Sequence, residues 1–327
     1  MKVKDVIQKA AYTSSGDLTT GGGILNRQQM DQFILLLSNH ASFASAIKLK
    51  RVNHPKGQID RLDLSSPVTR KAVSEASENT DTRKPTNSNV QYDTVKTASL
   101  IDITTEVEED NIEGKGIRQT IMELFARRIA IDQDQLLIQG DDSLVGSDVT
   151  TLLLQAYDGL NVQSTSCPNY LDANGLGVSL KLFKDGLAKL PTQFKRMDRS
   201  MFRFWIAPNP KEDLEYIFGS RLTSGGDNAF TKMVELAPFG IPLEPTTNIP
   251  TNQSIGTAAT DGTFVILTDP DNMIFVVQRE MQIHFEFRPR KDLTEVTIYL
   301  RTAFCIEDLN RMVKIRSVSA DASGAYA

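Results

Sequence analysis

The sequence contains few of the residues that build disulfide frameworks, metal centres or membrane spans. Its 327 residues include two cysteines, one tryptophan and three histidines. The cysteines, Cys167 and Cys305, are far apart and form no CxxC motif. A disulfide framework is therefore not expected, and a reducing cytosol is the natural compartment. The longest run of large apolar residues covers only residues 33–37, and no signal-peptide core follows Met1, so we expect no membrane association.

An excess of positive charge is also missing. The chain has 36 Lys and Arg residues against 41 Asp and Glu residues, for a formal net charge of −5. A protein that holds duplex DNA through phosphate contacts is usually basic, at least locally. Hydrophobic residues make up 40% and charged residues 24% of the chain, which is typical of a globular protein and excludes a wholly disordered one.

Catalytic motifs are absent as well. The chain has no GxxxxGK[ST], HExxH or GxSxG pattern, and His40, His54 and His284 are too widely separated in sequence to suggest a zinc site. The acidic run at 106–113 could serve metal or acid–base chemistry. Acids in front of a helix also stabilise its positive end, by about 0.3–1 kcal/mol each, and we favour that role. We therefore predict no catalytic residue, no metal site and no cofactor.

Two polar segments interrupt an otherwise ordinary globular sequence. Residues 1–26 are glycine-rich and polar, which predicts an extended arm before a short amphipathic helix at 27–39. Residues 65–95 contain no Leu, Ile, Phe, Met or Trp. A structureless loop of this length is uncommon in a compact domain. Its flanks alternate in polarity, so we predict a long two-stranded excursion that needs a partner, because isolated hairpins are marginally stable.

The remaining sequence predicts one long helix followed by alternating helices and strands. Residues 117–139 have helical periodicity and end before Gly140, a plausible C-terminal cap. The expected apolar face of this helix consists of Ile117, Ile121, Leu124, Phe125, Ile129, Leu136 and Leu137. Two further helices are expected at 179–190, capped by Ser179, and at 209–219 with Asn209 as the cap. Strands are expected at 202–207, 264–268, 273–277, 281–287, 295–304 and 312–318.

This order of elements resembles the major capsid proteins of tailed bacteriophages, the Hong Kong 97 fold family. The resemblance rests on the glycine-bearing arm, the long polar loop, and the return strand at 97–107 that runs into acids and a long helix. The ending of that helix at 134–141 and the segment 239–245 are also similar to the family. The resemblance implies an α+β fold with an N-terminal arm and short helix (1–61) and an extended E-loop (62–100). A P-domain with a spine helix (101–178), an A-domain (179–270), and closing P-domain strands with a C-terminal tail (271–327) would follow.

The resemblance also implies a function. Such a chain assembles with itself as hexamers and pentamers into an icosahedral shell, the capsid of a virion, in the cytoplasm of a host bacterium. The shell encloses double-stranded DNA without sequence-specific binding, which suits the net negative charge. Only about 26 residues precede the first expected helix, whereas some relatives carry a scaffolding domain there. A separate scaffolding protein or prior cleavage is therefore expected, together with a portal and, in some relatives, a decoration or cement protein.

Two groups of charged residues are candidates for contacts between subunits. Balanced charges in the E-loop suit pairing with a complementary neighbour, and the basic turn at 288–292 is either a solvated hairpin tip or a contact where capsomers meet. The candidate interface residues are Arg70, Lys71, Glu75, Glu78, Arg83, Lys84, Arg288, Arg290, Lys291 and Asp292.

Two alternatives stay open from the sequence. An encapsulin, a bacterial shell that holds cargo enzymes, would share the fold, although its E-loop is usually shorter and its N-terminus begins with a helix. A soluble α+β enzyme that uses the acidic run with a divalent metal is the second alternative. Nucleic acid inside purified particles would separate the first from a phage capsid, and metal content would test the second.

Overall fold

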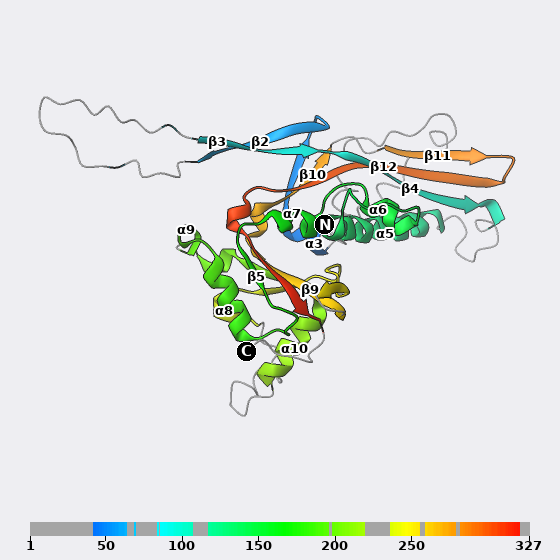
Figure 1. The fold of residues 1–327 in the computed structure, drawn as a ribbon. Helices are drawn as coiled ribbons and strands as arrows, with labels where there is room; N and C mark the ends of the chain where they lie inside the picture. The colour runs from blue at the N-terminus through cyan, green and yellow to red at the C-terminus, as the bar shows by residue number, and fades with distance from the viewer. Residues whose placement is uncertain are drawn as a thin grey trace, which may run out of the picture.

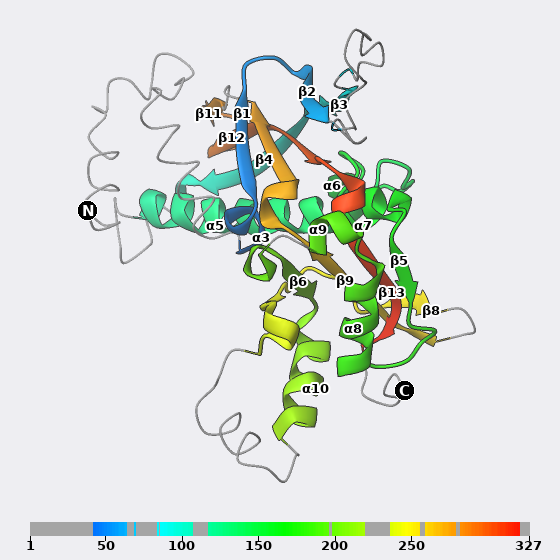
Figure 2. The same ribbon diagram turned by 90° about the vertical axis from the view of Figure 1, so that its left-hand side faces the viewer.

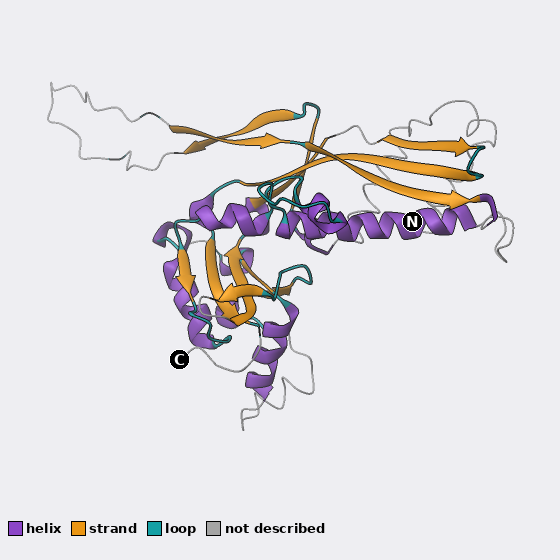
Figure 3. Cartoon of the chain, turned by 45° about the vertical axis from the view of Figure 1, so that its right-hand side comes forward, coloured by secondary structure: helices purple, strands orange, loops and turns teal. Residues whose placement is uncertain are grey.

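The chain forms two β-sheets, a projecting hairpin and one long helix, an α+β arrangement (Figures 1 and 3). The computed structural model describes residues 42–63, 69, 84, 86–106, 117–195, 198–219, 236–255, 259–278 and 282–320. The expected arm at 1–26, the short helix at 27–39 and most of the acidic run at 106–113 lie outside the described residues. None of the described helices is long and apolar enough to cross a membrane.

The first sheet has five strands around the long strand β12. These are β1 (Lys48–Val52), β10 (Met273–Gln278), β12 (Leu293–Ile306), β11 (Gln282–Arg288) and β4 (Val95–Thr104). Over residues 293–299, β12 pairs antiparallel with both β11 and β4. The expected strands at 273–277 and 295–304 are confirmed with longer bounds, and the strand expected at 281–287 is shifted by one residue.

The long helix α5 (Ile117–Gln139) covers the apolar face of this sheet and has the bounds that the sequence predicted. Ile129 of α5 is buried against Val296 and Ile298 of β12, with Phe125 packed beside them. Leu124 is 57% exposed, so its expected place on the apolar face was wrong. Successive helical residues are rotated by about 100°, and Phe125 faces the sheet, which turns Leu124 away from it.

The end of α5 shows why glycine follows it. The helix ends at Gln139, directly before Gly140, as predicted. The Gly140 amide still donates to the Leu136 carbonyl at 2.9 Å. A Cβ atom at Gly140 would lie 2.3 Å from the Tyr157 carbonyl oxygen. The glycine is therefore required by close packing against a neighbouring segment, since its φ is not in the left-handed region.

The second sheet has six strands and lies below the first in Figure 1. Its strands are β5 (Tyr170–Asp172), β13 (Val313–Ser319), β9 (Ala259–Thr268), β6 (Arg203–Ile206), β7 (Leu243–Pro245) and β8 (Gln253–Ile255). The domain bounds predicted from the sequence placed the last strand among the closing P-domain strands (271–327). They placed residues 170–172 in the P-domain with the spine helix (101–178). Both groupings differ from the structure, because β13 pairs with β5 and β9 in this sheet. The chain thus returns from the first sheet to the second after residue 306.

Helices α8 (Leu180–Lys189) and α10 (Pro208–Gly219) pack on the second sheet through one shared core. Ser179 caps α8 as expected, accepting from the Leu182 amide at 3.3 Å. The helix α10 begins at Pro208 rather than after an Asn209 cap. Proline is tolerated in the first helical turn because the amide it lacks would have no partner inside the helix.

The remaining elements are short. They are α3 (Ser42–Ala46), α6 (Val149–Leu154), α7 (Leu160–Gln163), α9 (Thr192–Lys195), and the 3₁₀ turns η2 (Ser164–Ser166), η3 (Arg199–Met201), η4 (Pro238–Gly240), η5 (Pro270–Asn272) and η6 (Leu309–Arg311). The largest core joins α3, α5 and both sheets. Phe43 of α3 meets Trp205 of β6 edge-on at 5.1 Å between ring centroids, so this core holds the two sheets together.

A two-stranded hairpin lies at the edges of the polar segment, as the sequence predicted, while residues 64–85 other than 69 and 84 lie outside the described residues. Strands β2 (Lys56–Asp63) and β3 (Thr86–Asp93) pair antiparallel over their full length. The hairpin begins at Lys56, six residues before the expected start of the E-loop at 62. In Figures 1 and 3 it projects from one end of the first sheet, and the β11–β12 hairpin extends to the opposite end.

Candidate functional site

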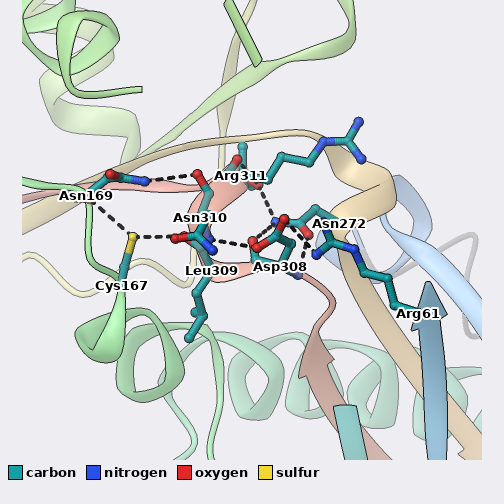
Figure 4. A network of polar contacts seen from close by, with 9 residues as sticks. Arg61, Cys167, Asn169, Asn272, Asp308, Leu309, Asn310 and Arg311 are labelled. Carbon is teal, nitrogen blue, oxygen red and sulfur yellow. Dashed lines mark hydrogen bonds and ion pairs between the residues drawn. The ribbon is translucent and has the colours of Figure 1, made fainter. Parts of the chain in front are cut away.

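The β2–β3 hairpin is joined, near the outer end of its described strands, to the place where the chain crosses between the two sheets. Arg61 on β2 places its Nη1 atom 2.7 Å from an oxygen of Asp308, a residue that is 9% exposed. The Asp308 amide donates to the Asn272 side-chain oxygen at 2.8 Å, and the Asn272 side-chain amide donates back to the Asp308 carbonyl at 3.0 Å. Figure 4 shows that these groups converge at one point.

Two of the connections between the sheets pass through this point. The turn η5 connects β9 to β10, and the turn η6 connects β12 to β13. Asp269 before η5 forms an ion pair with Arg311 in η6, and Asp308 caps η6 by accepting from the Asn310 amide at 2.9 Å. The two turns are therefore fixed to each other, and the hairpin is fixed to both through Arg61.

Apart from this contact the hairpin packs little of its length on the body. Ile59, Val90 and Tyr92 lie partly buried against a small apolar cluster of the first sheet that includes Val52 and Ile274. Other contacts of the hairpin are polar and exposed, such as the hydrogen bond that Asn89 of β3 donates to Gln58 of β2 at 3.1 Å. Lys84 is exposed. The other E-loop candidates, Arg70, Lys71, Glu75, Glu78 and Arg83, lie outside the described residues.

The four candidates at the β11–β12 turn are all exposed and lie at the tip of the second projection. Arg288 contacts Glu295 at 2.8 Å and Glu286 at 3.7 Å, and Lys291 lies 3.7 Å from Glu295. Asp292 adopts a φ of 51° and accepts a hydrogen bond from the Thr105 hydroxyl at 2.8 Å. Three of the candidates thus interact within the subunit.

Arg290 differs from its neighbours at this tip. It is exposed and has no ion pair among the residues that the structure describes. Its guanidinium is therefore the charge of this turn that is most available to another molecule.

Sequence reasoning missed a row of three acids next to this turn. Glu295 of β12 lies directly opposite Glu286 of β11 and also directly opposite Asp102 of β4. Like charges in directly opposite positions destabilise a sheet, so the Arg288 side chain serves to neutralise the row. Asp102 and Glu295 are far apart in sequence, and only the strand register brings them together.

The structure offers little catalytic chemistry in its described parts. Burial raises the pKa of the Cys167 thiol, and it raises that of Cys305 to about 11, which disfavours the reactive thiolates. His284 is half-buried and meets the ring of Tyr299 edge-on.

One group of acids outside the predicted run comes together. Asp141, Asp142 and Asp158 place carboxylate oxygens within 4.8 Å of one another at the surface. The charge of Asp158 raises the pKa of Asp142, as expected for adjacent carboxylates. The Asp142 amide also donates to the Asp158 carboxylate at 3.0 Å, so loop structure explains part of this clustering.

Comparisons of the sequence and of the structure with known proteins both find similarity to capsid proteins. No family model matches the chain. It is 29% identical over 321 residues to the putative prophage capsid protein YqbE of Bacillus subtilis strain 168, covering 97% of this chain and 100% of that protein.

Solved structures extend the similarity to the fold. The satellite phage P4 procapsid including the size determination (Sid) protein aligns with a TM-score of 0.70 and 11% identity, covering all of both chains. The capsid of a native GTA particle aligns with a TM-score of 0.60 and 13% identity, covering 95% of this chain and 99% of that one. The SrpI encapsulin of Synechococcus elongatus gives a TM-score of 0.52 and 11% identity, covering 100% and 98%.

Proposed function

We propose, from the premise that this chain is a capsid protein with the Hong Kong 97 fold, that its copies assemble into the icosahedral shell of a tailed bacteriophage. The shell would contain hexamers and pentamers and enclose double-stranded DNA. The observation that carries the proposal is the similarity to a prophage capsid protein along the whole of both chains. The role is structural.

The shape of the subunit supports assembly. Two hairpins project from opposite ends of the first sheet, and each exposes most of its polar surface (Figure 3). The β2–β3 hairpin is a separate two-stranded sheet, and such hairpins are marginally stable in water, whereas β12 of the second projection also pairs with β4. Contacts with neighbouring copies would supply the partner surface that the subunit itself does not provide.

Each structural part can be assigned to one of the proposed domains. We assign the β2–β3 hairpin and the residues between its strands to the E-loop, and the first sheet with α5 to the P-domain. The second sheet with α8 and α10 is assigned to the A-domain, directed towards the centre of each capsomer. A separate scaffolding protein, a portal and a decoration or cement protein are proposed partners. Assembly would occur in the cytoplasm of the host bacterium.

The charged residues at the two projections are the proposed contacts between subunits. In the E-loop these are Arg70, Lys71, Glu75, Glu78, Arg83 and Lys84. At the other projection, Arg290 would contact an acid of a neighbouring copy. Glu286 is a suitable acceptor because its side chain is 68% exposed and its contact with Arg288 is long, at 3.7 Å.

Sedimentation velocity and negative-stain microscopy of the purified full chain test the proposal. Closed particles of uniform size are expected, alone or after addition of a scaffolding protein. Particles from a natural lysate should contain nucleic acid that a nuclease digests only after the shell is opened. Enclosed protein without nucleic acid would favour an encapsulin, and a protein that remains small in all these preparations would contradict the proposal.

A further inference from the structure

A pocket with an apolar floor and a positively charged rim lies on the second sheet's domain. Its floor is formed by apolar side chains of α8 and α9 and of the residues that follow α8, η3 and η4, namely Leu187, Leu190, Phe194, Phe202 and Ile241. Lys184, Lys195 and Arg199 also line the pocket, and all three are exposed. No acidic residue is among its lining residues, so the pocket favours a ligand that is both apolar and negatively charged.

None of the three cations of the pocket forms an ion pair with another described residue. The Lys195 ammonium donates to the Ala188 carbonyl at 2.8 Å, and Arg199 donates to the Phe239 carbonyl at 3.4 Å. Phe239 is 41% exposed and has a φ of 57°. A positive φ is uncommon for a bulky residue, and such strain collects at functional positions. An exposed aromatic ring and three uncompensated charges therefore lie in one region.

A surface with the opposite properties lies on α10 of the same domain. Asn209, Glu212 and Tyr216 are exposed and follow one another at helical spacing, so they share one face, and Glu215 is exposed beside them. Tyr216 is 71% exposed. Glu212 has no ion pair in the part of the chain that the structure describes, and Glu215 has only a long contact with Lys211, at 3.8 Å. This face combines two acids with an aromatic side chain.

The two surfaces cannot meet within one subunit. Leu214 of α10 and Phe183 of α8 are completely buried in the same core, which fixes both helices to one sheet (Figure 2). To fill the pocket of its own chain, α10 would have to leave this core. The acidic face can therefore reach the pocket only of another molecule.

We propose that the α10 face of one copy, with Glu212, Glu215 and Tyr216, docks into the α8–α9 pocket of a second copy. Glu212 and Glu215 lie against the cationic rim, and the Tyr216 ring contacts the apolar floor and Phe239. Tyrosine and arginine are enriched at the energetically important positions of protein interfaces. Opposite charges fix the register of such a contact.

The contact joins two different surfaces, so it is heterologous. Each copy then offers one free pocket and one free helix face, and repetition gives a ring when the rotation between copies closes, as a capsomer requires. The inference rests on the proposed function and adds to it the residues that connect neighbours within a capsomer.

Cross-linking of the full chain tests the contact. The double variant Ala188→Cys with Asn209→Cys places one thiol beside the pocket and one on the α10 face without removing a proposed contact. A short bismaleimide should then give a ladder from dimers to closed rings. Each single-cysteine variant should give none, and a mixture of the two single variants should stop at dimers. The native Cys167 and Cys305 are buried and add little background.

Charge reversal supplies the specific control. In the double-cysteine background, Lys184→Glu or Glu212→Lys should lower the yield of the ladder by up to about fivefold, the factor that an exposed ion pair can supply. Combining them should restore it. Particles seen by microscopy without any ladder would overturn this inference and leave the proposed shell intact. Cross-linked dimers from either single variant alone would indicate a symmetric contact and would also overturn it.

Discussion

Arg61 on the projecting hairpin lies 2.7 Å from Asp308 at the junction of the two sheets. Asp308 is 9% exposed, while the Arg61 side chain is 30% exposed, so the pair is largely shielded from water. The same carboxylate caps η6, and its backbone is bound to Asn272 on the other connection. The direction in which the hairpin leaves the body is thus coupled to the path of the chain between its sheets.

Replacing Arg61 with Met should weaken this junction. It would leave a mostly buried carboxylate without its cation, and hydrogen bonds to charged groups contribute about 1.5–3 kcal/mol. We expect the free energy of unfolding, measured by urea denaturation, to fall by about 1–2 kcal/mol, since Arg61 is partly exposed. Lys56→Met is the matched control, because its ion pair with Asp93 is exposed on both sides. An equal loss in the two variants would show that the junction has no special role.

The outer part of the hairpin should serve assembly and not the fold of the subunit. Asp63 and Thr86 are directly opposite each other in the ladder, so residues 64–85 can be replaced by Asn-Gly, the dipeptide that suits a two-residue hairpin turn. The shortened chain should keep the cooperative unfolding of the parent but form no stable particles. A large decrease in melting temperature would mean that the removed segment stabilises the subunit itself.

Two leucines of α5 should respond differently to substitution. Leu136 is completely buried, so Leu136→Ala should cost about 2–5 kcal/mol in unfolding experiments. Leu124 is 57% exposed, and Leu124→Asp should leave an isolated subunit soluble and folded. Insoluble Leu124→Asp protein would contradict the orientation of the helix described above.

Lys314 should make the stability of the second sheet depend on alkaline pH. Burial lowers its pKa from 10.5 to about 8, although its ammonium donates to the Asn161 carbonyl at 2.7 Å. Between these two values the unfolded chain binds a proton that the folded chain does not. The contribution to the free energy of unfolding therefore rises with pH in this window. Lys314→Met should remove this rise when unfolding is compared at pH 7 and pH 10, and an unchanged difference would exclude Lys314 as its source.

Charge reversal at the β11–β12 tip should affect the shell more than the subunit. Arg290→Glu should leave the melting temperature of the subunit nearly unchanged, because exposed charges contribute only about 0–1 kcal/mol. Assembled particles should dissociate more readily, with an effect that differs between low and high salt. Arg288→Glu, which adds an acid beside Glu286 and Glu295, should instead destabilise the subunit. Unchanged particles in both salts would identify Arg290 as a residue of a solvated turn.

Local periodicity accounts for what the sequence could predict. The apolar pattern and Gly140 gave both ends of α5, and the polar segment between alternating flanks indicated the β2–β3 hairpin. These signals depend on residues that are neighbours in the chain.

Long-range relationships account for what the sequence could not predict. The pairing of β13 with β5 and β9, the contact between Arg61 and Asp308, and the acid row at Glu295 depend on how distant segments meet. Asp134, a buried residue of α5, is a further case. Its carboxylate accepts hydrogen bonds from the Phe43 and Ala44 amides at 3.1 and 2.9 Å, which holds α3 in place. An acid within a helical pattern gives no sign of such a partner.

The most direct test of the central claim is a cryo-electron microscopy reconstruction of particles formed by the full chain. The account predicts a closed icosahedral shell of hexamers and pentamers in which the second sheet's domain surrounds each capsomer axis. The β2–β3 hairpin of each copy should lie over a neighbouring subunit. Particles with no icosahedral symmetry, or a shell in which these hairpins contact no other copy, would contradict it.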